Sequence, residues 1–280
     1  MSRISVRFAD LAEARRAGLV TFMMAGDPDM AVFESILVGL PEAGADLIEI
    51  GMPFSDPMAD GPSIQAAGLR ALKAGTKLRH ILAAVARFRE RDTTTPIILM
   101  GYYNPIFHYG GDAFTRDAAA AGVDGLILVD LPPEEAGEFL PYVTRDRLDF
   151  IRLTTPTSDD ARLPKVLVGA SGFIYHVAIA GITGTRSASV ADVAPVVARI
   201  RRHTDLPVAI GFGIRTPEHA AASAAIADAV VVGSALIDTI ASNLNQDGVA
   251  GPELVSSVLT QVKGLAAGVR QVIRRTQDTQ

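Results

Sequence analysis

Residues 46–63 read DLIEIGMPFSDPMADGPS and join a buried strand to an acidic, proline-rich loop. Leu47, Ile48 and Ile50 are apolar without polar alternation, which is typical of a strand that is covered on both faces. Glu49 interrupts this run, and an ionised carboxylate among apolar side chains is costly without a partner or a task. The stretch therefore predicts a functional carboxyl at the C-terminal end of a strand, where α/β enzymes carry their sites.

The loop after this strand carries Asp56 and Asp60 among prolines. Aspartates commonly form turns, so loop geometry alone explains each of them better than catalysis does. Glu49 is different, because a buried glutamate is rare unless it has a partner or a function. On residue type alone, Glu49 is the first candidate for chemistry in this stretch.

Composition limits the class of protein. The chain has 280 residues, 49% of them hydrophobic, which suffices for one large barrel or two smaller domains. It has no cysteine, which excludes disulfides, thiolate metal sites and a cysteine nucleophile. A net charge of −5 without a basic stripe argues against nucleic-acid binding. The charged N-terminus does not resemble a signal peptide and no apolar run is long enough to span a membrane, so we expect a cytoplasmic enzyme.

Eight short apolar segments alternate with helical segments, and no linker separates them. The expected strands are residues 19–25, 47–51, 96–102, 125–129, 149–153, 173–177, 207–210 and 229–232. The expected helices between them are residues 30–43, 62–73, 78–89, 112–121, 133–144, 159–167, 190–203 and 216–225, with a loop at 103–111. Eight such units predict a single α/β domain over residues 1–280, a closed (β/α)8 TIM barrel.

Two further segments extend this barrel. A helix at residues 7–16 is expected to cap the bottom of the barrel, and one or two helices are expected at residues 252–274. A doubly wound open sheet is the alternative, but it usually has fewer strands. No GxGxxG motif follows the first strand, so a dinucleotide-binding fold is not favoured.

Strand alternation turns Glu49 into the barrel mouth if Ile48 and Ile50 face the helices. The same reasoning lets three aromatic side chains point inward near other strand ends: Phe22, Tyr102 and Tyr175. Each of them alone could equally be barrel core. Together with Glu49 they predict a pocket for a flat, apolar part of a substrate.

Glycine-rich loops predict the other end of the pocket. They are Gly181–Gly184, Gly211–Gly213, and Gly233 with Ser234. Loops after the last two strands of a barrel commonly bind phosphate through backbone N–H groups, although any one glycine could merely serve a tight turn. The five histidines lack a paired spacing for metal, so we predict no metal site and no histidine base, with His176 facing outward.

Seven motifs occur in an order that resembles the tryptophan synthase alpha subunit family: FMMAGDPD, IEIGMPFSDPMADGPSIQ, MGYYNPIFHYG, DLPPEE, GITGTR, GFGIRTPE and GSALI. The block of prolines and aspartates after Glu49 is highly specific. The resemblance implies a (β/α)8 barrel that cleaves indole-3-glycerol phosphate into indole and glyceraldehyde 3-phosphate. It also implies a tryptophan synthase beta subunit as partner, in an α2β2 complex, with pyridoxal phosphate in that partner and no cofactor in this chain.

The resemblance also implies roles for individual residues. Glu49 matches the catalytic acid–base, and Asp60 matches the carboxylate that contacts the indole N–H. The matching pocket residues are Phe22, Tyr102, Tyr175 and Phe212, and the matching phosphate cradle is Gly184, Gly213, Gly233 and Ser234. Thr183 falls on the loop that closes over the site, and Pro53 and Asp56 fall on the loop that meets the beta subunit.

The sequence departs from the family pattern after the sixth expected strand. Ala178 stands where the family usually has serine, and Ile179 and Ala180 make the start of that loop apolar. This departure motivates one alternative, a stand-alone lyase that releases free indole. Another alternative is a binding subunit that mainly activates its partner, although the intact Glu49 and Asp60 speak against it.

Overall fold

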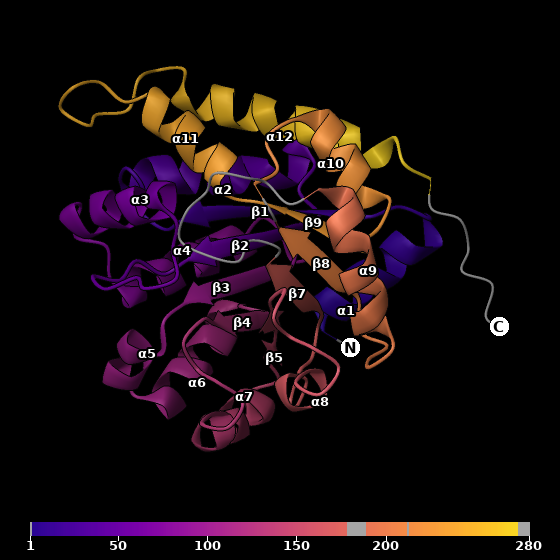
Figure 1. The fold of residues 1–280 in the computed structure, drawn as a ribbon. Coiled ribbons are helices and arrows are strands. Elements are labelled where there is room, and N and C mark those ends of the chain that lie inside the picture. Colours follow the sequence, from indigo (N-terminus) through magenta and orange to yellow (C-terminus); the bar gives the residue numbers. More distant parts are fainter. Residues whose placement is uncertain (1, 178–188, 212, 274–280) are drawn as a thin grey trace.

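The structure is a computed structural model that describes residues 2–177, 189–211 and 213–273. Within these residues, parallel strands form a nearly closed barrel that helices surround (Figure 1). The order around the barrel is β5-β4-β3-β2-β1-β9-β8-β7-β6. The strands are β1 (Gly18–Met24), β2 (Leu47–Gly51), β3 (Ile97–Gly101), β4 (Gly125–Leu128), β5 (Asp149–Phe150), β6 (Arg152–Thr154), β7 (Ile174–Val177), β8 (Val208–Gly211) and β9 (Ala229–Val232).

One segment, residues 149–154, closes the barrel. Its first half, β5, pairs with β4, and its second half, β6, pairs with β7. Only Ile151 separates the two halves, and its backbone N–H donates to the carbonyl oxygen of Leu126 at 3.0 Å. The prediction of eight strands in a TIM barrel is therefore confirmed, with the fifth strand divided into two short pieces. The alternative of an open doubly wound sheet is excluded.

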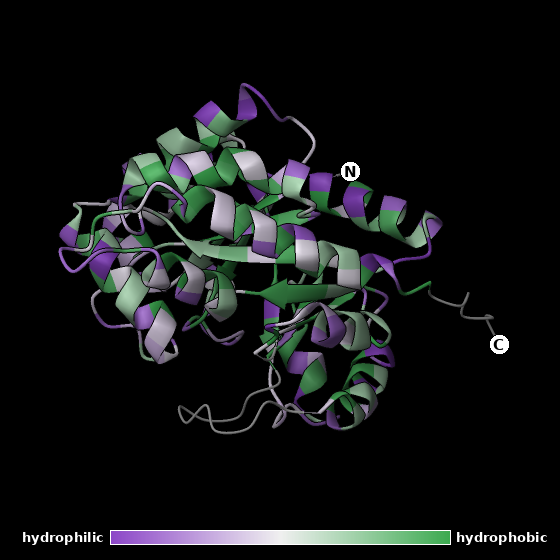
Figure 2. Ribbon diagram, turned by 90° about the horizontal axis from the view of Figure 1, so that it is seen from above, coloured by the Kyte–Doolittle hydropathy of each residue, from purple (hydrophilic) through white to green (hydrophobic). Residues whose placement is uncertain are grey.

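Helices cover the outside of the barrel, and Figure 2 shows hydrophobic strands surrounded by helices of mixed hydropathy. This mixture is expected when one helix face packs on the sheet and the other meets water. The helices are α1 (Arg3–Glu13), α2 (Met30–Ala43), α3 (Pro62–Lys73), α4 (Leu78–Arg89), α5 (Tyr103–Tyr109), α6 (Gly111–Ala121), η1 (Ala136–Glu138), α7 (Leu140–Arg145), α8 (Leu163–Val166), α9 (Val190–Arg201), α10 (Pro217–Ala224), α11 (Ser234–Ser242) and α12 (Leu254–Arg270).

Helix α5 lies where the sequence predicts a loop, so that prediction is wrong. Asn-Pro and Gly-Gly pairs suggested irregular structure, but Pro105 falls in the first turn of the helix, where proline is tolerated. The carboxylate of Asp130, from the loop after β4, accepts a hydrogen bond from the Tyr103 N–H at 2.8 Å. A side chain from another part of the barrel thus supports the start of this helix, and no local pattern could reveal it.

The continuous helix predicted at residues 133–144 is also wrong. The chain forms the short 3-10 helix η1 and then α7, which begins at Leu140 with Pro141 in its first turn. Proline lacks an N–H and cannot continue a helix from the turn before it, so the segment breaks there. Helix α11 is an addition that the sequence analysis missed, and the predicted C-terminal helical region is α12.

Helix α1 caps the N-terminal end of the barrel, as predicted. It begins earlier than expected because Ser2 provides its N-cap, with the Ser2 hydroxyl accepting from the Ser5 N–H at 3.2 Å. Its apolar residues Ile4, Phe8 and Leu11 are buried with the inward-facing residues of the strands. The rings of Phe8 and Phe173 lie 5.5 Å apart. The bottom of the barrel is therefore filled by side chains, which leaves the opposite end for a site.

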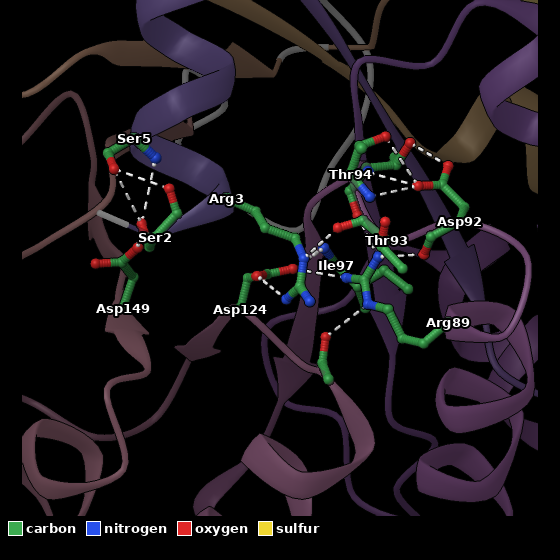
Figure 3. A network of polar contacts seen from close by, with 12 residues as sticks. Ser2, Arg3, Ser5, Arg89, Asp92, Thr93, Thr94, Ile97, Asp124 and Asp149 are labelled. Carbon is green, nitrogen blue, oxygen red and sulfur yellow. Dashed lines mark hydrogen bonds and ion pairs between the residues drawn. The ribbon is translucent and has the colours of Figure 1, made fainter.

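A polar network beneath the barrel ties α1 to the strands (Figure 3). Asp124, 5% exposed, accepts from Arg3 at 2.9 Å, from Arg89 at 2.7 Å and from the Ile97 N–H at 2.8 Å. The positive charges of two guanidinium groups thus offset the desolvation cost of one buried carboxylate. The same carboxylate accepts a hydrogen bond from the first N–H of β3. Such a cluster at the N-terminal end of a barrel serves stability.

We expect Asp124→Ala to lower the free energy of unfolding by about 3–5 kcal/mol, because it leaves the Arg89 guanidinium buried without a carboxylate. Urea unfolding followed by circular dichroism measures this change. Asp160→Ala is the matched control, since Asp160 pairs with Arg202 at the surface and its loss should change stability little. Equal effects of the two substitutions would contradict the role given to Asp124.

Candidate active site

A cavity of about 180 Å³ opens at the C-terminal ends of the strands. Glu49 and Asp60 line it together with Gly213, Gly233 and Ser234. The carboxyl groups and the glycine-rich loops that the sequence analysis singled out thus share one cavity. Its other lining residues are Phe22, Ile64, Met100, Tyr175, Gly211, Ile214, Arg215, Val231 and Ala235.

Glu49 is the buried acid of this cavity. It lies on β2 between Phe22 of β1 and Ile98 of β3, and 1% of its surface is exposed. Its Oε2 atom has no hydrogen-bond partner within the described part of the chain. Burial raises the pKa of its carboxyl from 4.5 to about 8, so the group carries a proton at neutral pH. A neutral carboxylic acid in an apolar cavity is placed to donate that proton.

Asp60 is the second acid, and it is half-buried on the loop after β2. Burial raises the pKa of its carboxyl, and a hydrogen bond from the Tyr102 hydroxyl opposes the rise. The loop is also held at neighbouring atoms, since the Ala59 N–H donates to the Tyr102 hydroxyl at 3.0 Å and Gln65 donates to the Asp60 carbonyl at 2.9 Å. Two side chains from α3 and the start of α5 thus fix the loop beside the cavity.

Tyr102 lies beside the cavity, where it contacts the lining residue Asp60 without being part of the lining itself. It precedes α5 and is 3% exposed, with its ring 5.4 Å from that of Phe54. Burial and the neighbouring Asp60 charge raise the pKa of its hydroxyl to about 12, while the Ala59 N–H opposes this rise. The hydroxyl therefore stays protonated and able to donate to Asp60.

Phe22 and Tyr175 form the aromatic walls, and glycines make room for them. An added Cβ at Gly51 would lie 2.7 Å from the Phe22 ring, and one at Gly211 would lie 2.5 Å from the Tyr175 hydroxyl oxygen. Burial, and then the charge of Glu49, raise the pKa of Tyr175 well above 10. The wall beside Glu49 is therefore neutral as well as aromatic.

The opposite side of the cavity is built from backbone. Gly213 adopts a φ of +70°, a conformation that favours glycine, and no atom of the described residues lies within 4 Å of an added Cβ there. Gly233 precedes α11, and Ser234 is the first residue of that helix. The first N–H groups of a helix lack intrahelical acceptors and carry a partial positive charge, so this edge suits an anion.

Three of the predicted site residues, Thr183, Gly184 and Phe212, lie outside the described residues, as do Ala178, Ile179 and Ala180. On the loop after β2, Pro53 is half-buried and Asp56 is exposed, away from the residues that line the cavity. The sequence analysis missed Met100, Val231 and Arg215. Strand alternation could have indicated the first two, since they share the inward face of β3 and β9.

His176 faces outward from β7, as predicted. It is 1% exposed, and its Nδ1 lies 3.1 Å from the Thr154 hydroxyl. Burial, helped by the charge of Arg199, lowers the pKa of the imidazole to about 4, so it is neutral at physiological pH. Among the described residues, no cluster of His, Asp or Glu could hold a metal ion. In the same residues, no helix is both long and apolar enough to cross a bilayer.

A cavity of about 270 Å³ lies at the opposite end of the barrel, beside α1. Its cationic residues Arg16 and Arg201 are paired with Asp46 at 2.7 Å and Asp228 at 3.1 Å. None of the buried, unpartnered side-chain atoms found in the described residues belongs to its lining. The C-terminal cavity, which holds such an atom on Glu49, is the better candidate for catalysis.

Comparison with known proteins agrees with this geometry. Residues 8–266 match the family model described as tryptophan synthase alpha chain. The chain belongs to this family. The structure resembles tryptophan synthase subunit alpha from Legionella pneumophila strain Paris, with a TM-score of 0.89 and 36% identity over 97% of this chain and 100% of that one. Members of the family are lyases that cleave indole-3-glycerol phosphate, so the chain is a lyase of tryptophan biosynthesis.

Two further solved structures are similar to this alpha chain. Tryptophan synthase from Mycobacterium tuberculosis in space group F222 has a TM-score of 0.86 and 37% identity, over 96% of this chain and 98% of that one. A chain from Aquifex aeolicus VF5 has the same TM-score of 0.86 and identity of 37%, over 96% of this chain and 100% of that one.

The buried acid of this alpha chain makes its stability depend on pH. The folded protein keeps the Glu49 proton up to about pH 8, whereas in the unfolded chain a carboxyl with the ordinary pKa of 4.5 loses its proton at a much lower pH. The unfolded state therefore binds fewer protons between these values, and the free energy of unfolding falls by about 1.4 kcal/mol per pH unit as pH rises. Glu49→Gln lacks this group and should become progressively more stable than the wild type across that range.

Urea unfolding of the wild type and of Glu49→Gln at intervals between about pH 5 and pH 8 measures this difference. The gap between the two unfolding free energies should widen with pH in favour of the glutamine variant. Parallel curves for the two proteins would mean that Glu49 loses its proton at a similar pH whether the chain is folded or unfolded.

Proposed function

We propose that the C-terminal cavity is the site at which this chain cleaves indole-3-glycerol phosphate, with Glu49 and Asp60 as its catalytic residues. One observation carries the proposal. A buried carboxyl with a raised pKa shares a single cavity with the backbone-lined edge formed by Gly213, Gly233 and Ser234. A substrate with an apolar ring at one end and a phosphate at the other fits this arrangement.

Glu49 serves in turn as general acid and general base. Its carboxylic acid protonates C3 of the indole ring. The resulting carboxylate takes the proton of the glycerol hydroxyl next to that carbon. The C–C bond then breaks, its electrons return to the ring, and the products are indole and the aldehyde of glyceraldehyde 3-phosphate. A pKa of about 8 suits both steps, because near neutral pH the free-energy difference between the protonated and the ionised carboxyl is small.

Asp60 stabilises the positive charge that these proton transfers create on the indole ring. Protonation at C3 makes the indole nitrogen cationic and its N–H a stronger donor. A carboxylate facing that N–H lowers the energy of the intermediate, an effect worth about 2.7–4 kcal/mol at comparable sites. Tyr102, which donates to Asp60 and accepts from Ala59, orients this carboxylate in our proposal.

The remaining site residues hold the two ends of the substrate. Phe22, Tyr175 and Phe212 flank the indole ring. The phosphate is bound by backbone N–H groups and a hydroxyl from Gly184, Gly213, Gly233 and Ser234, and Thr183 belongs to the loop over the site. Aromatic contact and helix-end N–H groups are the usual means of binding such groups.

The partner is a tryptophan synthase beta subunit, which holds the pyridoxal phosphate. Structures of tryptophan synthase from Mycobacterium tuberculosis are among those similar to this chain, which supports such a complex. We assign Pro53 and Asp56 to the contact, because Asp56 is exposed on the loop that also carries Asp60. We further propose an α2β2 stoichiometry, one domain over residues 1–280 and a cytoplasmic location.

We expect Glu49→Gln to lower kcat for indole formation roughly 10²–10⁴-fold and Asp60→Asn roughly 10²–10³-fold, because each loses a proton-transfer or charge-stabilising group. The assay follows indole released from indole-3-glycerol phosphate by the purified chain, alone and with a beta subunit. Glu34→Gln is the control, since Glu34 lies on α2 and pairs with Arg87 outside the barrel.

Near-normal turnover by both catalytic variants would contradict the roles given to Glu49 and Asp60. The same assay separates the alternatives, which the comparisons do not favour. Strong activation by the beta subunit excludes a stand-alone lyase. If the wild-type chain cleaves no indole-3-glycerol phosphate, either alone or with the beta subunit, it would instead be a subunit that only activates its partner.

A further inference from the structure

Arg215 brings a positive charge to the edge of the cavity. It follows Ile214 in the loop between β8 and α10, and among the described residues that line the cavity it is the sole cation. The acids of the lining are Glu49 and Asp60, and neither can supply positive charge. A phosphate dianion entering such a cavity needs positive charge in addition to backbone dipoles.

The guanidinium of Arg215 is held close to the start of α11. Its Nη1 lies 2.7 Å from the Asp238 carboxylate, and Asp238 is four residues after Ser234 on that helix. Side chains four residues apart on a helix are neighbours on one face, with Cβ atoms about 5–6 Å apart. The guanidinium is therefore roughly one helical turn from the N–H groups that the phosphate would approach.

The ion pair between Arg215 and Asp238 can be exchanged at little cost. The Arg215 side chain is 57% exposed and that of Asp238 is 39% exposed, and pairs of this kind contribute little to stability. Asp238 also accepts a hydrogen bond from Ser63 near the start of α3. Partial burial raises the pKa of Asp238, but the bonds from Ser63 and Arg215 outweigh it and lower the pKa overall. Asp238 therefore keeps a partner when the arginine leaves.

We propose that Arg215 is a phosphate ligand of this chain, which Asp238 holds beside the site and releases to the phosphate group when the substrate binds. A guanidinium presents two parallel N–H groups that match two phosphate oxygens. When Arg215 moves from Asp238 to the substrate, it exchanges a singly charged, exposed carboxylate for a doubly charged phosphate. The inference rests on the proposed function, because it assigns a further contact to the same substrate.

The test measures affinity for each end of the substrate separately. Isothermal titration calorimetry with glycerol 3-phosphate probes the phosphate edge, and titration with indole probes the ring pocket. Arg215→Gln should weaken glycerol 3-phosphate binding about tenfold, the loss of one charge-assisted contact, and leave indole binding unchanged. With indole-3-glycerol phosphate, KM should rise by a similar factor while kcat changes less than about twofold.

Two further variants make the test specific. Asp238→Asn frees the arginine and retains a side chain that can accept from Ser63, so glycerol 3-phosphate should bind as tightly as to the wild type or more tightly. Arg202→Gln removes the same charge from an exposed pair with Asp160 outside the cavity lining, and it should leave both affinities unchanged.

Equal binding of glycerol 3-phosphate by the wild type and Arg215→Gln would overturn the inference, and intact cleavage would leave the proposed function standing. Loss of indole binding in Arg215→Gln would overturn it as well, since the arginine would then support the shape of the pocket. A wild type that neither cleaves indole-3-glycerol phosphate nor binds glycerol 3-phosphate would contradict the proposed function itself.

Discussion

The carboxyl of Glu49 lies among apolar side chains at the mouth of the barrel, and the chemistry of the site follows from that placement. Alternation along β2 puts Leu47 in the barrel core and Glu49 two residues further, inside the cavity. Ionising this group costs free energy that no neighbouring cation in the described residues offsets, so its pKa rises to about 8. The fold thereby maintains a protonated acid at a pH where free carboxyl groups are charged.

Carboxyl groups at the two ends of the barrel differ in the partners that surround them. At the N-terminal end, the aspartates that precede β2, β4 and β9 each accept a hydrogen bond from an N–H within the first two residues of a neighbouring strand: Leu19, Ile97 and Val208. Each of these aspartates is also paired with an arginine: Asp46 with Arg16, Asp124 with Arg89, and Asp228 with Arg201. These groups are satisfied and serve stability. At the C-terminal end no described residue gives Glu49 such a partner, which is consistent with a group that exchanges protons.

Patterns within one strand or one helix could be predicted from the sequence. The alternation in β2 correctly predicted that the Glu49 side chain faces the inside of the barrel. The apolar stripe of α1 correctly predicted that this helix caps the barrel. Features that depend on distant residues could not be predicted in this way. Asp130 supports the start of α5 from another loop, and the Tyr102 hydroxyl accepts a hydrogen bond from the Ala59 N–H of the loop after β2. The position of Arg215 likewise depends on Asp238 from a later helix.

The folded protein keeps Glu49 protonated at neutral pH, and the proposed chemistry of the site depends on this proton. The most direct measurement is a ¹³C NMR titration of glutamate side-chain carboxyl carbons, with the Glu49 signal assigned by its absence from Glu49→Gln. We predict a midpoint for this signal near pH 8, well above the ordinary value of 4.5. A midpoint close to that ordinary value would show that the carboxyl is charged at neutral pH and would contradict its assignment as a proton donor.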